Sequence, residues 1–225
     1  MSFIPKKEVV EKIKESGMIP VFNHPDLETC KGVLKACYDG GARVFEFTKR
    51  SESALEVFLE LKQYVQDELP EMLLGIGSII DAKTTNQFIQ AGADFIVSPA
   101  LVPEMADICK ENNVVWAPGC GTVSEIVLAQ KLGADIVKLF PGAQVGGPSF
   151  VKAVLGPLPD SLLMPTGGVS PDRENLKAWL DSGVCCVGMG SKLFPKEWIK
   201  NGEFDKLSAK VKNTYSLIDQ IRKEM

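Results

Sequence analysis

The sequence has only one histidine, His24, and no pair of cysteines at the CxxC spacing. One histidine excludes a metal site made of several histidines. The six cysteines have no histidine partner at metal-ligand spacing, and most lie in apolar runs or on predicted helices, where a reduced cysteine acts as a small hydrophobic residue. We therefore expect no metal ion.

The sequence also lacks an excess of basic residues and a long hydrophobic run. Its 25 Lys and Arg residues are balanced by 29 Asp and Glu residues, so the net charge of -4 gives no basic field for nucleic acid or an anionic membrane. No apolar run approaches membrane-spanning length, and residues 1–16 are charged and amphipathic, without the apolar core of a signal peptide. We expect a cytoplasmic protein with no nucleic-acid or membrane partner.

The composition, with 45% hydrophobic and 24% charged residues, is typical of a soluble globular protein. Short apolar runs alternate along the chain with amphipathic helical stretches, a pattern that predicts repeated strand–helix units and a parallel sheet. The eight predicted strands cover residues 18–22, 43–48, 73–78, 94–99, 114–119, 135–140, 162–167 and 184–190.

Several helical stretches end in a glycine just before the next strand, as helix C-caps do: Gly41, Gly92, Gly133 and Gly183. Eight strand–helix units in 225 residues predict a single α/β domain, residues 1–225, folded as a (β/α)8 TIM barrel. An open doubly wound sheet is the alternative, but the glycine fingerprint that it usually carries is missing after the first strand. Residues 1–17 are predicted as an extra N-terminal helix and residues 203–225 as a C-terminal helix.

Lys138 stands in the middle of the apolar run "DIVKLF". Burial of an ammonium group is costly unless the group is paired or loses its proton. Side chains alternate along a barrel strand between the lumen and the helix layer, so Val137 and Leu139 face one way and Lys138 the other. A lysine in the dry helix layer would lack partners, and we therefore place Lys138 in the lumen.

The bulky Phe45 and Phe47 suit the helix layer, so Val44, Glu46 and Thr48 of the same run face the lumen, and Arg50 continues that side. The same alternation predicts two further inward polar side chains near C-terminal strand ends: Ser78, after Leu74 and Ile76, and Thr166, after Met164.

Lys138 has two interpretations in this setting. It could form a salt bridge with Glu46 inside the barrel. Alternatively, burial and the nearby Arg50 disfavour its charged form and free the amine to attack a carbonyl, giving a Schiff base. The iminium would act as an electron sink for breaking an adjacent C–C bond, with Glu46 transferring protons. Arg50 is either a surface charge or a clamp for a substrate carboxylate, and its inward orientation favours the clamp.

Glycine turns follow the last two predicted strands, in "PTGGVS" (165–170) and "GMGS" (188–191). Each alone is compatible with a tight connection. Turns that precede helices offer backbone N–H groups to an anion, and this is the usual phosphate position in such barrels. The pair therefore indicates a phosphate site.

These motifs together resemble the KDPG/KHG aldolase family, class I aldolases that cleave 2-keto-3-deoxy-6-phosphogluconate (KDPG) and 4-hydroxy-2-oxoglutarate (KHG). The resemblance follows the chain through "MIPVF", "GGARVFEFTKR", "LGIGSI", "GADFIVSPAL", "APGCGTVSEI", "VKLFPGA", "MPTGGVS" and "GMGSKLFP". It implies a (β/α)8 barrel, usually a homotrimer, that forms a Schiff base between the lysine of its sixth strand and a keto acid. It implies neither a metal nor any other cofactor.

By this resemblance, Lys138 is the Schiff-base lysine and Glu46 is the general acid and base. Arg50 holds the pyruvate carboxylate, and Ser78 stands where the family commonly has threonine. The resemblance implies further substrate contacts from Pro99 and Pro118 at the mouth, Phe140 beside the pyruvyl group, and Thr166, Gly167, Gly168, Gly190 and Ser191 in the two substrate turns.

The sequence departs from the family pattern at a few positions outside the residues that break the C–C bond. Ala143 stands where relatives often have glutamate, and Lys49 where an apolar residue is common. Asn23 and His24 stand where some relatives have an arginine that reaches the substrate. The distal group, a phosphorylated sugar acid, a short keto acid or both, is therefore left open. We interpret His24, beside Pro25 and a predicted helix start, as a loop residue and not a catalyst.

The expected reaction is cleavage of KDPG or KHG to pyruvate and an aldehyde, glyceraldehyde 3-phosphate or glyoxylate. One alternative is a phosphosugar isomerase or epimerase, or another phosphate-binding barrel, in which Lys138 acts electrostatically without a covalent adduct. A second alternative is a non-catalytic ligand-binding barrel, which the combination of Glu46, Arg50 and Lys138 disfavours.

Overall fold

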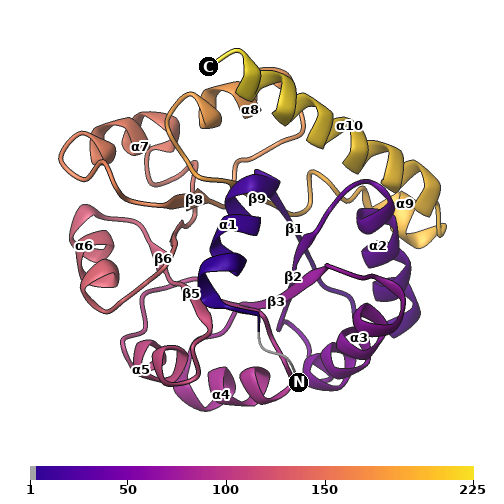
Figure 1. Cartoon of the computed structure of the whole chain (residues 1–225). Coiled ribbons are helices and arrows are strands. Elements are labelled where there is room, and N and C mark those ends of the chain that lie inside the picture. The colour runs from indigo at the N-terminus through magenta and orange to yellow at the C-terminus, as the bar shows by residue number, and fades with distance from the viewer. Residues whose placement is uncertain (1–3) are drawn as a thin grey trace.

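A computed structural model describes residues 4–225 as an alternation of strands and helices (Figure 1). The first three residues of the N-terminal helix predicted for residues 1–17 lie outside the described residues. The strands are β1 (Met18–Phe22), β2 (Val44–Thr48), β3 (Leu73–Gly77), β4 (Phe95–Val97), β5 (Val115–Ala117), β6 (Gly119–Cys120), β7 (Val137–Leu139), β8 (Leu163–Pro165) and β9 (Val187–Met189). The helices are α1 (Lys6–Ser16), α2 (Leu27–Asp39), α3 (Ala54–Glu68), α4 (Ala82–Gln90), α5 (Glu104–Glu111), α6 (Val123–Lys131), α7 (Gly147–Leu155), α8 (Arg173–Leu180), α9 (Lys196–Lys200) and α10 (Phe204–Lys223).

The strands pair in parallel and close into a barrel. One sheet has the order β5-β4-β3-β2-β1-β9, and a second has the order β6-β7-β8. β5 and β6 are the two halves of the fifth predicted strand, interrupted at Pro118, which has no backbone N–H to donate. A parallel bridge between Thr166 and Gly188 connects the β8 side to β9. Because β9 also pairs with β1, the prediction of a closed (β/α)8 barrel is confirmed and the alternative of an open sheet is wrong.

Apolar side chains fill the lumen toward the N-terminal ends of the strands. Figure 1 shows α1 lying across the centre of the ring. Val9 and Ile13 of α1 are 2% and 1% exposed and pack into this inner cluster. The barrel residues of the cluster are Ile19, Val44, Leu73, Phe95, Val97, Val115, Ala117, Ile136, Met164 and Cys186. The predicted extra helix therefore closes one end of the barrel and leaves the other end for polar groups.

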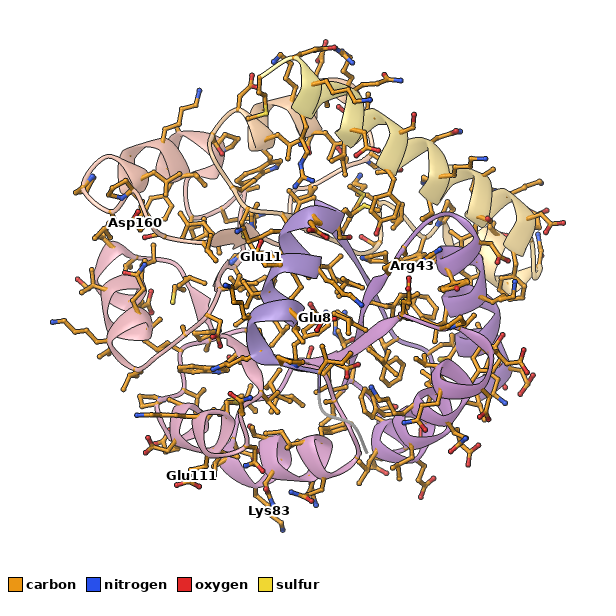
Figure 2. The ribbon with its side chains drawn as sticks, in the orientation of Figure 1. Glu8, Glu11, Arg43, Lys83, Glu111 and Asp160 are labelled. Carbon is orange, nitrogen blue, oxygen red and sulfur yellow. The ribbon has the colours of Figure 1, made fainter. Side chains whose placement is uncertain are left out.

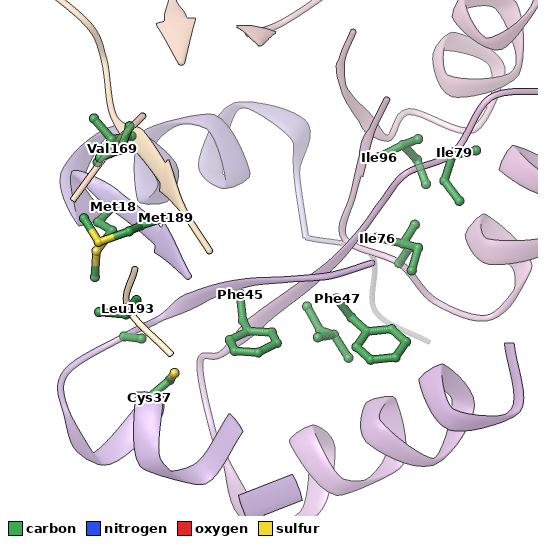
Figure 3. Close-up of a cluster of buried hydrophobic side chains, with 14 of the residues drawn as sticks. Met18, Cys37, Phe45, Phe47, Ile76, Ile79, Ile96, Val169, Met189 and Leu193 are labelled. Atoms are coloured by element: carbon green, nitrogen blue, oxygen red, sulfur yellow. The ribbon is translucent and has the colours of Figure 1, made fainter. Parts of the chain in front are cut away.

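A second core lies between the strands and the surrounding helices (Figure 3). Phe45 and Phe47 of β2 belong to it, as their predicted orientation requires, together with Ile76 of β3 and Ile96 of β4. All four side chains are at most 1% exposed. Burial of a side chain of this size contributes about 1.5–3 kcal/mol, so these contacts fix which face of β2 and β3 points inward.

Helix boundaries follow local signals in the sequence. Gly41, Gly92, Gly133 and Gly183 all have positive φ, between 88° and 101°, and each follows the end of a ring helix, as predicted. Helix α6 begins with a capping box, in which Thr122 accepts a hydrogen bond from the backbone of Glu125 while the Glu125 carboxylate accepts one from the Gly121 N–H.

The C-terminal helix α10 packs against α2 and α8 and occupies the eighth position of the helical ring (Figure 1). It matches the helix predicted for residues 203–225, whereas the short α9 before it is an addition to the prediction. Charged side chains such as Lys83, Glu111 and Asp160 lie at the outer rim (Figure 2). Within residues 4–225, no helix combines the length and apolar character needed to cross a membrane.

Candidate active site

Lys138 and Glu46 lie together inside the barrel, near the C-terminal ends of β7 and β2. The distance from Lys138 Nζ to Glu46 Oε1 is 3.6 Å, and the side chains are 6% and 1% exposed. Neither carboxylate oxygen of Glu46 finds a hydrogen-bond partner among the described residues. A buried carboxylate without hydrogen bonds stabilises the fold poorly, so the pair is better suited to chemistry than to structure.

The packing of β7 positions Lys138. Val137 and Leu139 belong to the helix-layer core, and Ile136 belongs to the inner cluster, so the predicted inward orientation of Lys138 is confirmed. The Lys138 backbone N–H donates to the Pro118 carbonyl over 2.9 Å. Pro118 is buried, so this hydrogen bond attaches the backbone of Lys138 to a fixed part of the barrel wall.

Phe140 lies beside the lysine at the mouth. The Lys138 Nζ atom is 5.3 Å from the centroid of the Phe140 ring, within the range of a cation–π contact. The ring is 36% exposed, which makes it one wall of the opening toward solvent.

Gly77 on β3 makes room for the Glu46 carboxylate. A Cβ atom added at Gly77 would overlap Glu46 Oε1, and one added at Gly75 would overlap the ring of Phe95 in the lumen. Gly75 and Gly77 therefore face inward, where side chains would fill the space of the site. Neither glycine was predicted from the sequence as part of the site, although their spacing of two residues in "LLGIGS" is the available signal for one face of a strand.

Ser78 reaches the mouth by a route that differs from the prediction. Leu74 and Ile76, which were expected to face inward with it, belong to the helix-layer core, so that part of the prediction is wrong. The strand ends at Gly77, and Ser78 adopts a left-handed backbone conformation with φ of 63°. Its Oγ atom accepts a long hydrogen bond of 3.5 Å from Nε of the exposed Arg50. The turn, and not strand alternation, brings Ser78 and Arg50 together.

The mouth near Pro99 is shaped by a close approach between backbones. A Cβ atom at Gly119 would overlap the Pro99 carbonyl, so β6 can pass this closely only with glycine. Ser98 is fully buried, and its hydroxyl donates to the Ala100 carbonyl over 2.8 Å, which fixes the turn that carries Pro99.

Thr166 follows β8 and is 9% exposed, with a hydroxyl that has no hydrogen-bond partner among residues 4–225. The predicted inward orientation with Met164 is confirmed, since Met164 belongs to the inner cluster. Gly167 and Gly168 have φ of 92° and 79°, which only glycine adopts without strain. The bridge between Thr166 and Gly188 brings this turn next to the one that carries Gly190 and Ser191.

The loop after β7 rests on the same turn. The Gly142 N–H donates to the Thr166 carbonyl over 2.9 Å, and the Ala143 N–H donates to the Gly167 carbonyl over 3.1 Å. A Cβ atom at Gly168 would overlap that of Ala143. Ala143, one of the departures from the family pattern, is therefore in direct contact with the turn formed by Gly167 and Gly168.

The two glycine turns differ in the charged residues near them. Asp172 caps α8 after the first turn, and hydrogen bonds from the Ser170 hydroxyl and the Asn175 N–H lower the pKa of its carboxyl group. This carboxylate disfavours a phosphate at the start of α8. The second turn, at Gly190 and Ser191, is followed by Lys192.

The histidine and the buried cysteine nearest the site have structural roles. His24 Nδ1 accepts a hydrogen bond of 3.1 Å from the backbone of Asp26 at the start of α2, in agreement with its interpretation as a loop residue. Burial raises the pKa of the Cys120 thiol to about 12, which keeps it in the thiol form. No group of three or more His, Cys, Asp or Glu side chains suited to a metal ion occurs within the described residues.

A parallel barrel with a lysine and a glutamate buried at the C-terminal ends of its strands has the architecture of a class I aldolase. The model of the KDPG and KHG aldolase family matches residues 9–210. The KHG/KDPG aldolase of Escherichia coli K12 is 32% identical over 204 residues, which cover 90% of this chain and 92% of the relative. The 2-dehydro-3-deoxy-phosphogluconate aldolase of Pseudomonas aeruginosa is 33% identical over 192 residues, 85% and 84% of the two chains. The chain belongs to the KDPG and KHG aldolase family.

Solved structures agree with this assignment. The KDPG aldolase of Legionella pneumophila, which holds pyruvate as a covalent carbinolamine, is 29% identical with a TM-score of 0.83, over 91% of this chain and 97% of that one. The thiamine phosphate pyrophosphorylase of Pyrococcus furiosus, at 16% identity and a TM-score of 0.70 over 94% and 98% of the two chains, shares the fold alone. Neither the isomerase alternative nor the non-catalytic one is favoured by these similarities.

Proposed function

We propose that this protein is a class I aldolase that cleaves KDPG, KHG or both to pyruvate and an aldehyde through a Schiff base on Lys138. The observation that carries the proposal is the buried pair of Lys138 Nζ and Glu46 Oε1, 3.6 Å apart, at the mouth of the barrel. A carboxylate at this distance can remove a proton from the amine or from a bound substrate. The carbinolamine in the Legionella pneumophila relative supports the covalent step.

The reaction begins when the neutral amine of Lys138 attacks C2 of the keto acid. Loss of water from the carbinolamine gives an iminium ion. Glu46 then accepts the proton of the C4 hydroxyl group, the C3–C4 electron pair moves toward the iminium nitrogen, and the aldehyde leaves. The resulting enamine takes a proton at C3 from Glu46, and hydrolysis of the imine releases pyruvate and restores Lys138.

The surrounding residues bind the two ends of the substrate. Arg50 and Ser78, held together by their hydrogen bond, bind the carboxylate next to C2. Phe140 and the prolines Pro99 and Pro118 confine the pyruvyl group, and Thr166 contacts its polar side.

The distal group lies between the two glycine turns. In KDPG this group ends in a phosphate, and in KHG it is a carboxylate. We propose that Gly190 and Ser191 carry most of the anion binding, because the Asp172 carboxylate disfavours an anion at the start of α8. Gly167 and Gly168 line the opposite side of the substrate's carbon chain.

The test is release of pyruvate from KDPG and from KHG, measured in a coupled assay with lactate dehydrogenase. The wild-type protein should release pyruvate from at least one of them, and Lys138→Ala should lower kcat/KM by at least about a thousandfold. Lys62→Met is the matched control, because Lys62 is also partly buried and pairs with a carboxylate, that of Asp94, outside the site. No release by wild-type protein, or equal activity of Lys138→Ala, would refute the proposal.

We also propose that the protein is a cytoplasmic homotrimer: the trimer is what the resemblance implies, and the cytoplasmic location follows from the charged N-terminal segment and the short apolar runs. Large apolar side chains of Ile80, Val123 and Leu128 are 62%, 44% and 44% exposed, and an interface between copies would cover them. Light scattering should give three times the chain mass of 24.5 kDa. A monomer mass at micromolar concentration would contradict this part of the proposal.

A further inference from the structure

Thr48 is a buried polar residue that the proposed reaction does not use. It is the last residue of β2 and is 2% exposed. Its hydroxyl group has no hydrogen-bond partner among the described residues. A buried hydroxyl without a partner costs free energy that valine, which has the same shape, would avoid. Its placement therefore calls for a ligand or a functional partner.

The alternation of β2 places Thr48 in the lumen beside Glu46. Phe45 and Phe47 belong to the helix-layer core, and Val44 belongs to the inner cluster. Thr48 is four residues after Val44 and two after Glu46, so its side chain lies on the same inner face, nearer the mouth.

The Glu46 carboxylate extends to the level of Thr48. Its Oε1 atom occupies the space where a Cβ atom of Gly77 would lie. Gly77 is the residue of β3 that pairs with Thr48. Neighbouring strands are about 4.8 Å apart, so the carboxylate and the Thr48 hydroxyl lie side by side without a direct hydrogen bond.

One shared water molecule would give hydrogen-bond partners to the unpartnered polar atoms of Glu46 and Thr48. Both oxygens of Glu46 and the hydroxyl of Thr48 are unpartnered in the described part of the chain, and the Lys138 ammonium group is 3.6 Å from the carboxylate. A water molecule between them would satisfy groups on two strands and would lie on the path between Glu46 and a substrate bound to Lys138.

We propose that Thr48 is a positioning residue, whose hydroxyl group shares a water molecule with Glu46 and orients it for proton transfer to and from C3 of the substrate. The inference rests on the proposed Schiff-base reaction. In the step concerned, Glu46 takes a proton from C3 of the pyruvyl iminium through this water. The C–H electron pair becomes the C2–C3 double bond and the C=N pair moves to nitrogen, giving a neutral enamine. The reverse step returns a proton from solvent to C3.

Exchange of the pyruvate methyl protons with deuterated water isolates this step, because it needs the Schiff base and proton transfer but no aldehyde. It is measured by proton NMR in wild-type protein, Thr48→Val and Thr48→Ser, beside borohydride trapping of pyruvate. Thr214→Val is the matched control, since Thr214 is also 2% exposed but its hydroxyl donates to the Lys210 carbonyl on α10.

Thr48→Val should trap pyruvate with the same half-saturating concentration as wild type and exchange its protons on the order of tenfold more slowly, or worse. Thr48→Ser should recover most of the rate, and Thr214→Val should exchange at the wild-type rate. Because valine keeps the shape of the side chain and the Thr48 hydroxyl bonds to no described residue, the urea midpoint of Thr48→Val should equal or exceed that of wild type.

Two results would overturn the inference. One is wild-type exchange by Thr48→Val. The other is a parallel loss of trapping and exchange, which would assign Thr48 to substrate binding or structure. Failure of the proposed function itself is distinguishable, because wild-type protein would then neither trap pyruvate nor exchange its protons.

Discussion

Gly77 determines where the carboxylate of Glu46 can lie. A side chain at this position would occupy the space of Glu46 Oε1, so the glycine is needed for the distance between Glu46 and Lys138. Strand alternation predicted that Lys138, Glu46 and Thr166 face inward, because the side chains on the opposite face are bulky and apolar. It failed for β3, where Leu74 and Ile76 face the helix layer and the side-chain-free Gly75 and Gly77 face the lumen. Ser78 reaches the mouth only because the strand ends at Gly77 and the backbone turns into the left-handed region. A turn of this kind depends on tertiary contacts and is not visible in a hydrophobic pattern.

Gly77→Ala should displace the Glu46 carboxylate and lower the rate of pyruvate release by about a hundredfold, since a shift of about 1 Å in a catalytic group has an effect of this size. Lys138 is on another strand, so trapping of pyruvate by borohydride should persist. Gly133→Ala is the control for a glycine substitution away from the site, where an added Cβ meets no atom within 4 Å. Because Gly133 has a positive φ of 89°, Gly133→Ala should lower the stability of the protein without changing kcat. Wild-type turnover in Gly77→Ala would contradict the assigned position of Glu46.

The sequence predicted the number of strands correctly but overestimated the length of several of them. Each of the eight predicted strands is present, but the run at 94–99 forms a regular strand only over Phe95–Val97 and the run at 184–190 only over Val187–Met189. Apolar periodicity extends beyond the residues that form a regular strand, and the length of the strand depends on its neighbours. The split at Pro118 has a local cause, the missing N–H of proline.

Helix α6 offers a test at this scale through its capping box. Hydrogen bonds from the Gly121 N–H and the Thr122 side chain lower the pKa of the Glu125 carboxyl group below its ordinary value of 4.5. A carboxylate with a lowered folded-state pKa stabilises the protein above the unfolded-state pKa, and this contribution is lost as the pH falls through the folded-state pKa.

Glu125→Ala should therefore lower the free energy of unfolding by about 0.5–1 kcal/mol at pH 7. The difference from wild type should shrink as the pH falls below 4.5, the ordinary value of the group. Urea unfolding at several pH values measures this difference in unfolding free energy. Glu60→Ala, on the exposed face of α3, is the control. A difference that stays constant down to pH 3 would mean that the Glu125 charge does not cap the helix.

The whole molecule separates stability from chemistry along the barrel axis. The inner cluster and α1 fill the N-terminal end, whereas the polar residues of the site occupy the C-terminal end. The sequence predicted the extra helix, the barrel and the end at which the site lies. It could not predict that α1 closes the barrel, because the amphipathic pattern of a helix does not identify the surface against which it packs.

Ile13→Ala tests this division of the molecule. Ile13 is 1% exposed in the inner cluster, so its truncation should cost about 2–5 kcal/mol of unfolding free energy. The control Lys12→Ala, which removes an exposed pair with Glu8 at 3.9 Å, should change stability by less than about 0.5 kcal/mol. Folded Ile13→Ala should keep wild-type kcat, since the site is at the other end. An unchanged urea midpoint would show that α1 is not part of the core.

The central claim is the covalent bond between Lys138 and pyruvate, and one measurement tests it most directly. The protein is incubated with pyruvate, reduced with borohydride, digested and weighed by mass spectrometry. We expect wild-type protein to gain the mass of one reduced pyruvyl group on the peptide that contains Lys138, and Lys138→Ala to gain none. No gain on wild-type protein, or the same gain in Lys138→Ala, would contradict the account.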